Sequence, residues 1–203
     1  MTAVDEDSDV ATRARSLLGR LLHGHGVTVR ITEVEAYGGV TDRASHAYSR
    51  TARSEIMYGP PWRLYVYRSY GIHHCANVVT GPTEQAAAVL VRAGAVVDGI
   101  DIARQRRGPH VPDDRLARGP GNLAQALGLT LDDLGTDLLT HDGVHLGPEV
   151  ATPDGVLSGP RVGVSQAADV PWRFWLAHEP SVSAYRRSPR AAGMETANSN
   201  PAP

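Results

Sequence analysis

Carboxylates and an aromatic side chain recur at two-residue spacing in the segment Ile31–Tyr37. Residues of one parity share a face of a strand, so Glu35 and Tyr37 would continue the apolar face that Val27 and Val29 begin. We expect Glu35 to leave this face where the core opens into a cavity, a desolvated position that suits a general base. The alternative is a surface strand end with two solvated glutamates, because charged residues are mostly exposed.

Six further blocks with chemically useful side chains follow in order along the chain. They are Asp42–Tyr48, Met57–Pro60, Leu64–Val79, Val89–Ala93, Leu116–Leu123 and Gly159–Val164. Together with the Glu35 segment, this ordered set closely resembles the alkyladenine (3-methyladenine) DNA glycosylase family. The resemblance covers about residues 11–188, and six blocks in the same order are a specific signal.

The resemblance implies hydrolysis of the bond between a base and deoxyribose, a reaction with an oxocarbenium-like transition state. Glu35 then matches the general base that deprotonates the attacking water, and its charge would stabilise the cationic sugar. Arg92 matches the arginine that helps hold this water, and the main-chain carbonyl of Val162 is a third holder. Taken alone, Arg92 could equally be the buried partner of an Asp or Glu. No lysine nucleophile lies at the proposed centre, so we expect hydrolysis without a Schiff-base route.

The resemblance also implies a pocket for a base that is flipped out of the duplex. Tyr37, His46 and Tyr67 match the residues that sandwich this base, and aromatic faces attract the positive charge of an alkylated purine. Asn77 matches a pocket-floor residue that disfavours the exocyclic amino group of guanine. Tyr70 matches the residue that enters the minor groove and fills the vacated space. Each tyrosine could instead be ordinary sheet packing, since tyrosines are common in strands.

Candidate contacts to the DNA backbone come from two irregular segments. Residues 38–61 mix basic and aromatic side chains, which suits a surface that meets phosphates and bases. Gly119-Pro120-Gly121-Asn122 introduces a helix whose first N–H groups could bind a phosphate, with a simple cap by Asn122 as the alternative. The proposed backbone contacts are Arg53, Met57, Tyr58, Arg118, Gly119, Gly121 and Asn122.

The net charge of -2 argues against a generic nucleic-acid coat protein, which would be clearly basic. Four acidic residues lie in the first ten positions, and without them 20 basic residues stand against 18 acidic ones. The basic residues are clustered at Arg104, Arg106 and Arg107, at Arg115 and Arg118, and at Arg186, Arg187 and Arg190. A local basic face is enough for an enzyme that follows the DNA backbone, although each cluster alone could be solvated surface.

Composition also limits the compartment and the partners. One cysteine, Cys75, excludes an internal disulfide and fits a reducing cytoplasm. The acidic N-terminus is not a signal peptide, and no run of about eighteen apolar residues is present. We expect a bacterial cytoplasmic monomer, without membrane contact, that binds double-stranded DNA containing damaged purines. No metal-binding cluster stands out, so we expect neither a metal nor another cofactor.

The pattern of apolar residues predicts one mixed α/β (α+β) domain, residues 11–188, around a curved, largely antiparallel sheet with flanking helices. Residues 1–10 and 189–203 should be disordered, because they are poor in apolar residues. The expected helices are 11–22, 97–107 and 123–127. The expected strands are 27–37, 64–70, 75–80, 86–93, 161–166 and 173–177, with a hairpin over 138–146.

The function expected is a monofunctional DNA glycosylase of base excision repair, which flips and excises purines of the 3-methyladenine, hypoxanthine or ethenoadenine type. Two other classes stay open, a damaged-DNA-binding protein without catalysis and a nucleoside or RNA N-ribosyl hydrolase. The carboxylate of Glu35 argues against a pure binder, which has no use for it. A comparison of activity on duplex DNA and on free nucleoside would distinguish a DNA glycosylase from a nucleoside or RNA N-ribosyl hydrolase.

Overall fold

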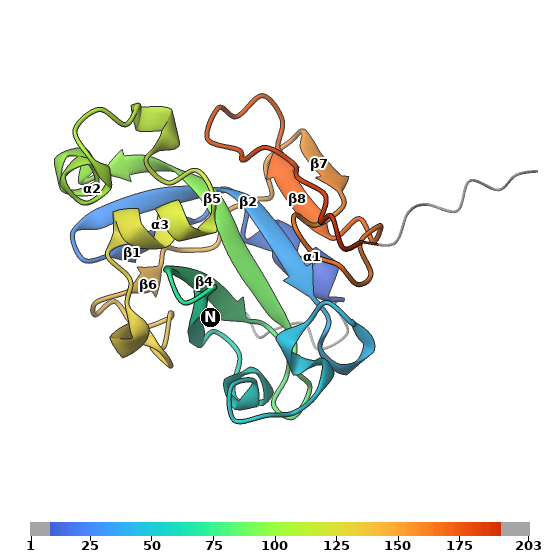
Figure 1. Cartoon of the computed structure of the whole chain (residues 1–203). Coiled ribbons are helices and arrows are strands. Elements are labelled where there is room, and N and C mark those ends of the chain that lie inside the picture. Colours follow the sequence, from blue (N-terminus) through green and yellow to red (C-terminus); the bar gives the residue numbers. More distant parts are fainter. Residues whose placement is uncertain (1–8, 192–203) are drawn as a thin grey trace, which may run out of the picture.

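The computed structural model describes residues 9–191, which form one eight-stranded sheet flanked by three α-helices (Figure 1). In chain order the elements are α1 (Val10–Ser16), β1 (Leu21–Gly24), β2 (Val27–Tyr37), β3 (Leu64–Ser69), β4 (His73–Val79), β5 (Ala88–Asp98), α2 (Ile100–Arg107), α3 (Pro120–Leu127), β6 (His145–Leu146), β7 (Val156–Gly159) and β8 (Arg173–Leu176). The predicted mixed α+β chain with a curled antiparallel sheet is therefore confirmed.

The sheet is organised around the long antiparallel pair β2 and β5. The strand order is β3-β4-β5-β2-β1-β6, and β8, which also pairs with β7, joins the free side of β2. The strand β2 therefore changes partner along its length, from β1 near its start to β8 at Glu33–Glu35. This exchange curls the sheet and places Glu35 between β5 and β8, deep in the fold.

Two irregularities in the β2–β5 ladder lie beside Glu35. The register shifts by one residue at Thr32 in β2 and shifts back at Arg92 in β5, so neither residue has a partner directly across. Gly94 allows the close approach of the strands, because a Cβ there would clash with Val29 and with main-chain atoms of Arg30. Such bulges re-aim side chains, so the simple alternation expected for β2 holds only in segments, and both of its faces are largely buried.

Helix α3 covers the face of the sheet formed by β4 and β5, and α2 packs against α3 (Figure 1). The buried side of α3 is apolar and includes Leu123 and Leu127. Pro120 suits the first helical position, where an N–H would have no partner in the helix, and Gly128 ends the helix in a left-handed conformation. Residues 38–61 form the predicted long irregular segment, with only short 3-10 helices at Gly39–Thr41, His46–Tyr48 and Glu55–Tyr58.

Two predicted elements near the N-terminus and after β5 have different bounds. The helix expected over 11–22 ends at Ser16, and Leu21–Gly24 is a strand. Gly19 adopts a φ of +83° in the turn that follows the helix, and Leu22 buries its side chain from the strand β1. Val97 belongs to β5, because that strand runs on to Asp98 before α2 begins.

Two further predictions are wrong. Residues 161–166 are irregular, and the strand in this region is β7, just before them. The hairpin over 138–146 does not form as two paired strands. The N–H of Leu146 donates to the carbonyl of Leu138 at 2.8 Å, but β6 is only two residues long and pairs with β1. Asp9 caps α1 and Val10 starts it, while the other residues of the predicted N-terminal tail, and 192–203 of the C-terminal one, lie outside the described chain.

Candidate active site

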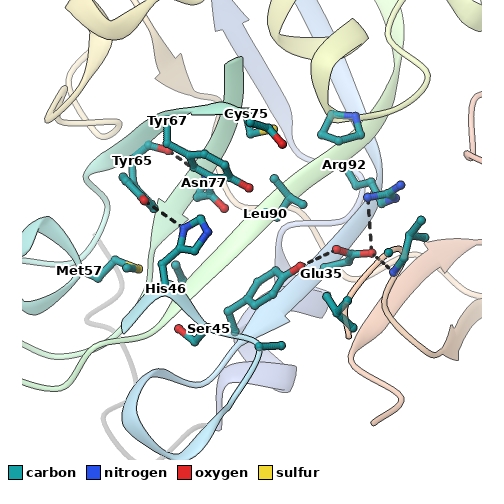
Figure 2. Close-up of a pocket in the computed structure, with 18 of the residues that line it drawn as sticks. Glu35, Ser45, His46, Met57, Tyr65, Tyr67, Cys75, Asn77, Leu90 and Arg92 are labelled. Atoms are coloured by element: carbon teal, nitrogen blue, oxygen red, sulfur yellow. Dashed lines mark hydrogen bonds and ion pairs between the residues drawn. The ribbon is translucent and has the colours of Figure 1, made fainter. Parts of the chain in front are cut away.

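A cavity of about 500 Å³ opens where β2, β3, β4 and β5 meet the irregular segment 38–61 (Figure 2). Most of the predicted site residues line it: Glu35, Tyr37, His46, Arg53, Met57, Tyr67, Tyr70, Asn77, Arg92 and Val162. These residues are up to 127 positions apart in the chain, as the bond between Glu35 and Val162 shows. The fold thus gathers the predicted catalytic and base-binding residues in one cavity.

Glu35 is fully buried from solvent, yet its carboxylate borders the cavity. Its Oε1 accepts a hydrogen bond of 2.8 Å from the main-chain N–H of Val162, and its Oε2 accepts one of 2.8 Å from the Tyr37 hydroxyl. The Arg92 guanidinium lies 3.6 Å from Oε1. The alternative of a solvated strand end is wrong, because Glu35 is buried. Its hydrogen bonds are the partners that a buried carboxylate requires.

Glu33 is a second buried carboxylate, and it lies on the other side of Arg92. Its Oε1 is 3.2 Å from Arg92 Nε and 2.6 Å from Arg173 Nε. Arg92 therefore bridges two glutamates, and its side chain is only 12% exposed. The position of Arg92 at the bulge in β5 gives its side chain this direction.

Arg161 fixes the segment that carries Val162. Its guanidinium is fully buried, pairs with Asp42, and donates a hydrogen bond of 2.9 Å to the main-chain carbonyl of Ala36. The same group lies 4.8 Å from the centre of the Tyr37 ring. One arginine thus holds both the N–H donor to Glu35 and the ring of Tyr37.

Aromatic side chains form the opposite wall of the cavity (Figure 2). His46 packs edge-on against Tyr67, with ring centroids 4.7 Å apart, and its Nδ1 is 3.1 Å from the Tyr65 hydroxyl. Burial, with Arg53 nearby, lowers the pKa of His46 to about 4. Burial also raises the pKa of Tyr67 and raises that of Tyr37 well above its usual value. At neutral pH these rings are therefore uncharged.

Asn77 and Tyr70 occupy opposite ends of the site. Asn77 is buried, and its Nδ2 donates a hydrogen bond of 3.0 Å to the main-chain carbonyl of Tyr65, directly across the β3–β4 pair. Tyr70 is 93% exposed at the tip of the β3–β4 hairpin. The N–H of Ile72 closes this turn on the carbonyl of Ser69 at 3.1 Å. Asn77 thus belongs to the floor of the cavity, whereas Tyr70 projects from its rim.

The predicted contacts to the DNA backbone divide into two groups. Arg53 lies at the cavity, where its guanidinium donates to the Tyr65 hydroxyl at 3.2 Å and covers the Tyr67 ring at 4.7 Å. The side chains of Met57 and Tyr58 are buried in a small core below segment 38–61, where Met57 also borders the cavity, so neither offers an exposed surface to the DNA backbone. Only their main chain could make the predicted contact.

The second group surrounds the start of α3 and does not line the cavity. Arg118 donates a hydrogen bond of 2.8 Å to the carbonyl of Val182. Gly119 is the N-cap residue without a side-chain cap, and a Cβ on Gly121 would press on His73. Asn122 does not cap the helix, because its Nδ2 donates to the carbonyl of Arg118 at 2.6 Å.

The arginine cluster on α2 is used within the fold. Arg104 forms ion pairs with Asp101 and Asp113, while Arg106 and Arg107 donate to main-chain carbonyl groups. The cluster therefore tethers α2 to its neighbours, and the sequence prediction of a phosphate-binding face there is weakened. The arginines that line the cavity are Arg53, Arg68 and Arg92.

Several site residues were missed in the sequence: Glu33, Asp42, Arg68, Arg161, Arg173 and Ser183. The pairing of Glu33 with Arg173 and Ser183 joins positions about 140 to 150 residues apart, which no local spacing reveals. The sequence did contain an indication of Glu33, because it lies two residues before Glu35 and residues at this spacing share a face of a strand. It also contained an indication of Arg161, which immediately precedes Val162.

Within residues 9–191, no three side chains of His, Cys, Asp or Glu are arranged to hold a metal ion. None of the helices in this described range has the length and hydrophobicity that a membrane crossing requires.

Comparison with known proteins places the chain among hydrolases of DNA repair that act on N-glycosyl bonds. The family model for methylpurine-DNA glycosylase matches residues 4–180. A candidate 3-methyladenine DNA glycosylase of Mycolicibacterium paratuberculosis is 54% identical over 196 residues, which is 94% of this chain and 95% of that protein. A protein of the same name from Mycobacterium leprae is 54% identical over 189 residues, 90% and 88% of the two chains. The chain belongs to the methylpurine-DNA glycosylase family, which confirms the resemblance found in the sequence.

Proposed function

We propose that this protein flips damaged purines out of duplex DNA and removes them by hydrolysis, as a monofunctional glycosylase. The substrates we expect are 3-methyladenine, which the names of the two relatives contain, and the neutral lesions hypoxanthine and ethenoadenine. The observation that carries the proposal is Glu35, a fully buried carboxylate at the edge of an aromatic cavity. A protein that only binds damage would gain nothing from burying this charge.

Glu35 takes the role of general base for the attacking water. The N–H of Val162 and the hydroxyl of Tyr37 fix the carboxylate, one on each oxygen. The 3.6 Å between Arg92 Nη1 and Glu35 Oε1 exceeds a hydrogen bond, so this N–H can donate to a water that Glu35 deprotonates. The negative charge then faces the sugar as positive charge develops on it, which lowers the barrier. The main-chain carbonyl of Val162 remains the proposed third contact to this water.

The base would stack between Tyr37 and the pair formed by His46 and Tyr67. Uncharged aromatic faces accept neutral purines by stacking and cationic purines by cation–π attraction, which fits a broad range of lesions. Tyr70, exposed on the hairpin, would fill the gap in the duplex. A nucleoside hydrolase has no need for such a projecting residue, so the hairpin favours duplex DNA over a free nucleoside.

The proposed route is direct hydrolysis that leaves an abasic site. The chain contains no lysine at any position, so no side-chain amine is available for a Schiff base with the sugar. Strand cleavage coupled to base removal is therefore not expected from this protein.

The decisive test is base release from duplex oligonucleotides that each carry one lesion. Wild-type protein should release the free base and leave a strand that breaks only after alkali treatment. Glu35→Gln keeps the shape of the side chain but cannot accept the proton, so it should abolish excision while lesion binding is largely retained. If this variant excises the base at a single-turnover rate within a few-fold of wild type, Glu35 is not the general base.

A further inference from the structure

We propose that Ser183 and Glu33 are positioning residues that keep Arg92 at ion-pair distance from Glu35 but out of a direct hydrogen bond with it, so that residues 179–183 contribute to the active site. We call residues 179–183 the C-terminal strap. The proposal rests on the proposed function, because it concerns the arginine that holds the attacking water.

The strap is fastened to one stretch of β2 by three separate contacts. Glu179 forms an ion pair of 2.7 Å with Arg30, and the Ser181 hydroxyl is 2.8 Å from that of Thr32. The third contact is at Glu33, which accepts hydrogen bonds from the main-chain N–H and the hydroxyl of Ser183 at 2.8 and 3.0 Å. The bulge at Thr32 allows adjacent residues of β2 to contact the same strap, because it interrupts the alternation of faces.

The strap also reaches Arg92 directly. Arg92 Nε donates to the Ser183 hydroxyl at 3.1 Å and lies 3.2 Å from Glu33 Oε1. Nε is thereby held next to Glu33. Nη1 of the same guanidinium lies at the longer distance of 3.6 Å from Oε1 of Glu35, and Figure 2 shows this contact between Arg92 and Glu35. The arginine is thus tethered by one edge and offers its other edge to the cavity.

This tether solves a problem that the charges create. A buried guanidinium next to a buried carboxylate would form a direct, bidentate ion pair, which is the strongest arrangement available to the two groups. Such a pair would occupy the lone pairs that Glu35 needs for the water. Glu33 competes for Arg92, and Arg173 at 2.6 Å from Glu33 keeps the set of two carboxylates and two guanidinium groups neutral. Glu35 therefore stays available as a base.

Ser183→Ala tests the proposal with little disturbance of the fold, because the main-chain N–H of residue 183 can still donate to Glu33. We expect single-turnover excision to fall about tenfold or more, since a misplacement near 1 Å can cost roughly 100-fold. Affinity for lesion duplex should stay within about twofold, and Ser183→Thr should restore much of the rate. In an Arg92→Ala background the Ser183→Ala change should cost nothing further.

Ser181→Ala is the matched control, because it removes a buried hydroxyl from the same strap without touching Arg92. Equal rate losses in Ser181→Ala and Ser183→Ala, or an undiminished loss in the Arg92→Ala background, would overturn the proposal in favour of a structural role. The Nε–H signal of Arg92 in an NMR spectrum reads the tether without any activity. It should shift and exchange faster with water in Ser183→Ala but not in Ser181→Ala.

The two proposals can fail separately. A wild-type protein that releases no base would overturn the proposed function while the NMR signal still reports the tether. An Nε–H signal that Ser183→Ala leaves unchanged would overturn the tether, even if wild-type excision is fast.

Discussion

The hydroxyl of Tyr37 donates a hydrogen bond of 2.8 Å to Oε2 of Glu35, two residues earlier on the same strand. Strand geometry produces this contact, because residues i and i+2 project from one face. Tyr37 therefore lines the cavity with its ring and fixes the Glu35 carboxylate with its hydroxyl, so in the proposed function it would serve both the base and the general base. Burial and the adjacent Glu35 raise the pKa of Tyr37 well above its usual value, so the hydroxyl keeps its donor proton at neutral pH.

Tyr37→Phe should separate these two roles. The ring is kept, so lesion binding should remain close to that of wild type. Loss of a hydrogen bond to a charged group costs about 1.5 kcal/mol or more, so single-turnover excision should fall by roughly tenfold. Tyr37→Ala should lower both excision and binding. If Tyr37→Phe excises at the wild-type rate, the hydroxyl does not help to orient Glu35.

His46 should make folding depend on pH in a predictable direction. Its pKa is about 4 in the folded protein against an ordinary value of 6.5, so the fold favours the neutral ring. The unfolded chain takes up a proton first as the pH drops, so the contribution of His46 to stability is present above pH 6.5 and is lost toward pH 4. His46→Gln should flatten this part of the dependence of Tm on pH. An NMR titration that finds the His46 ring half-protonated near pH 6.5 would contradict the prediction.

The hairpin that carries Tyr70 has a conformation that favours glycine. Tyr70 and Gly71 have φ values of 50° and 70°, and positive φ at both central residues is the mark of a type I′ turn. A bulky residue at such a position costs stability, and this cost supports the proposed role of the exposed Tyr70 ring.

Tyr70→Gly should remove the stability cost of the positive φ and, at the same time, the ring that is proposed to fill the gap in the duplex. We expect stability to stay the same or rise by about 0.5–1 kcal/mol, since glycine adopts positive φ freely. Excision and flipping of a lesion in duplex DNA should weaken, with a smaller effect on the same lesion in single-stranded DNA. Thermal melting and excision from the two substrates measure this. Equal losses on both substrates would show that Tyr70 does not act on the duplex.

The resemblance in the sequence predicted most of the residues that line the cavity, and several of these residues lie on strands where the alternation is regular. Glu35 with Tyr37, and Tyr65 with Tyr67, keep the predicted spacing on β2 and β3. The sequence could not show what holds these groups. The register shifts at Thr32 and Arg92 depend on the partner strand, and a one-residue shift reverses every later side chain.

Errors in the secondary structure have a similar origin. The leucines at 17, 18, 21 and 22 fit a helical stripe, but the tertiary structure divides them between a loop and β1. Residues 161–166 look like a strand because Val162 and Val164 occupy alternate positions, yet Arg161 is buried and ion-paired with Asp42 and fixes an irregular path. Burial by distant partners, not local propensity, decides the structure at both places.

Asn77→Ser should relax discrimination against guanine-type bases more than it changes excision of hypoxanthine. The amide of Asn77 is anchored to the carbonyl of Tyr65 at 3.0 Å and is buried, so it cannot swing away from the 2-amino group of guanine. Serine is shorter and makes room, and discrimination that depends on bulk is usually worth about 1–3 kcal/mol. Loss of the hydrogen bond from the Asn77 amide should also lower the free energy of unfolding by about 1 kcal/mol. Thermal melting of the variant measures this loss and serves as a control. The measurement is single-turnover excision of a guanine-derived lesion and of hypoxanthine at one salt concentration. A ratio of the two rates that stays at the wild-type value would assign Asn77 to packing between β3 and β4.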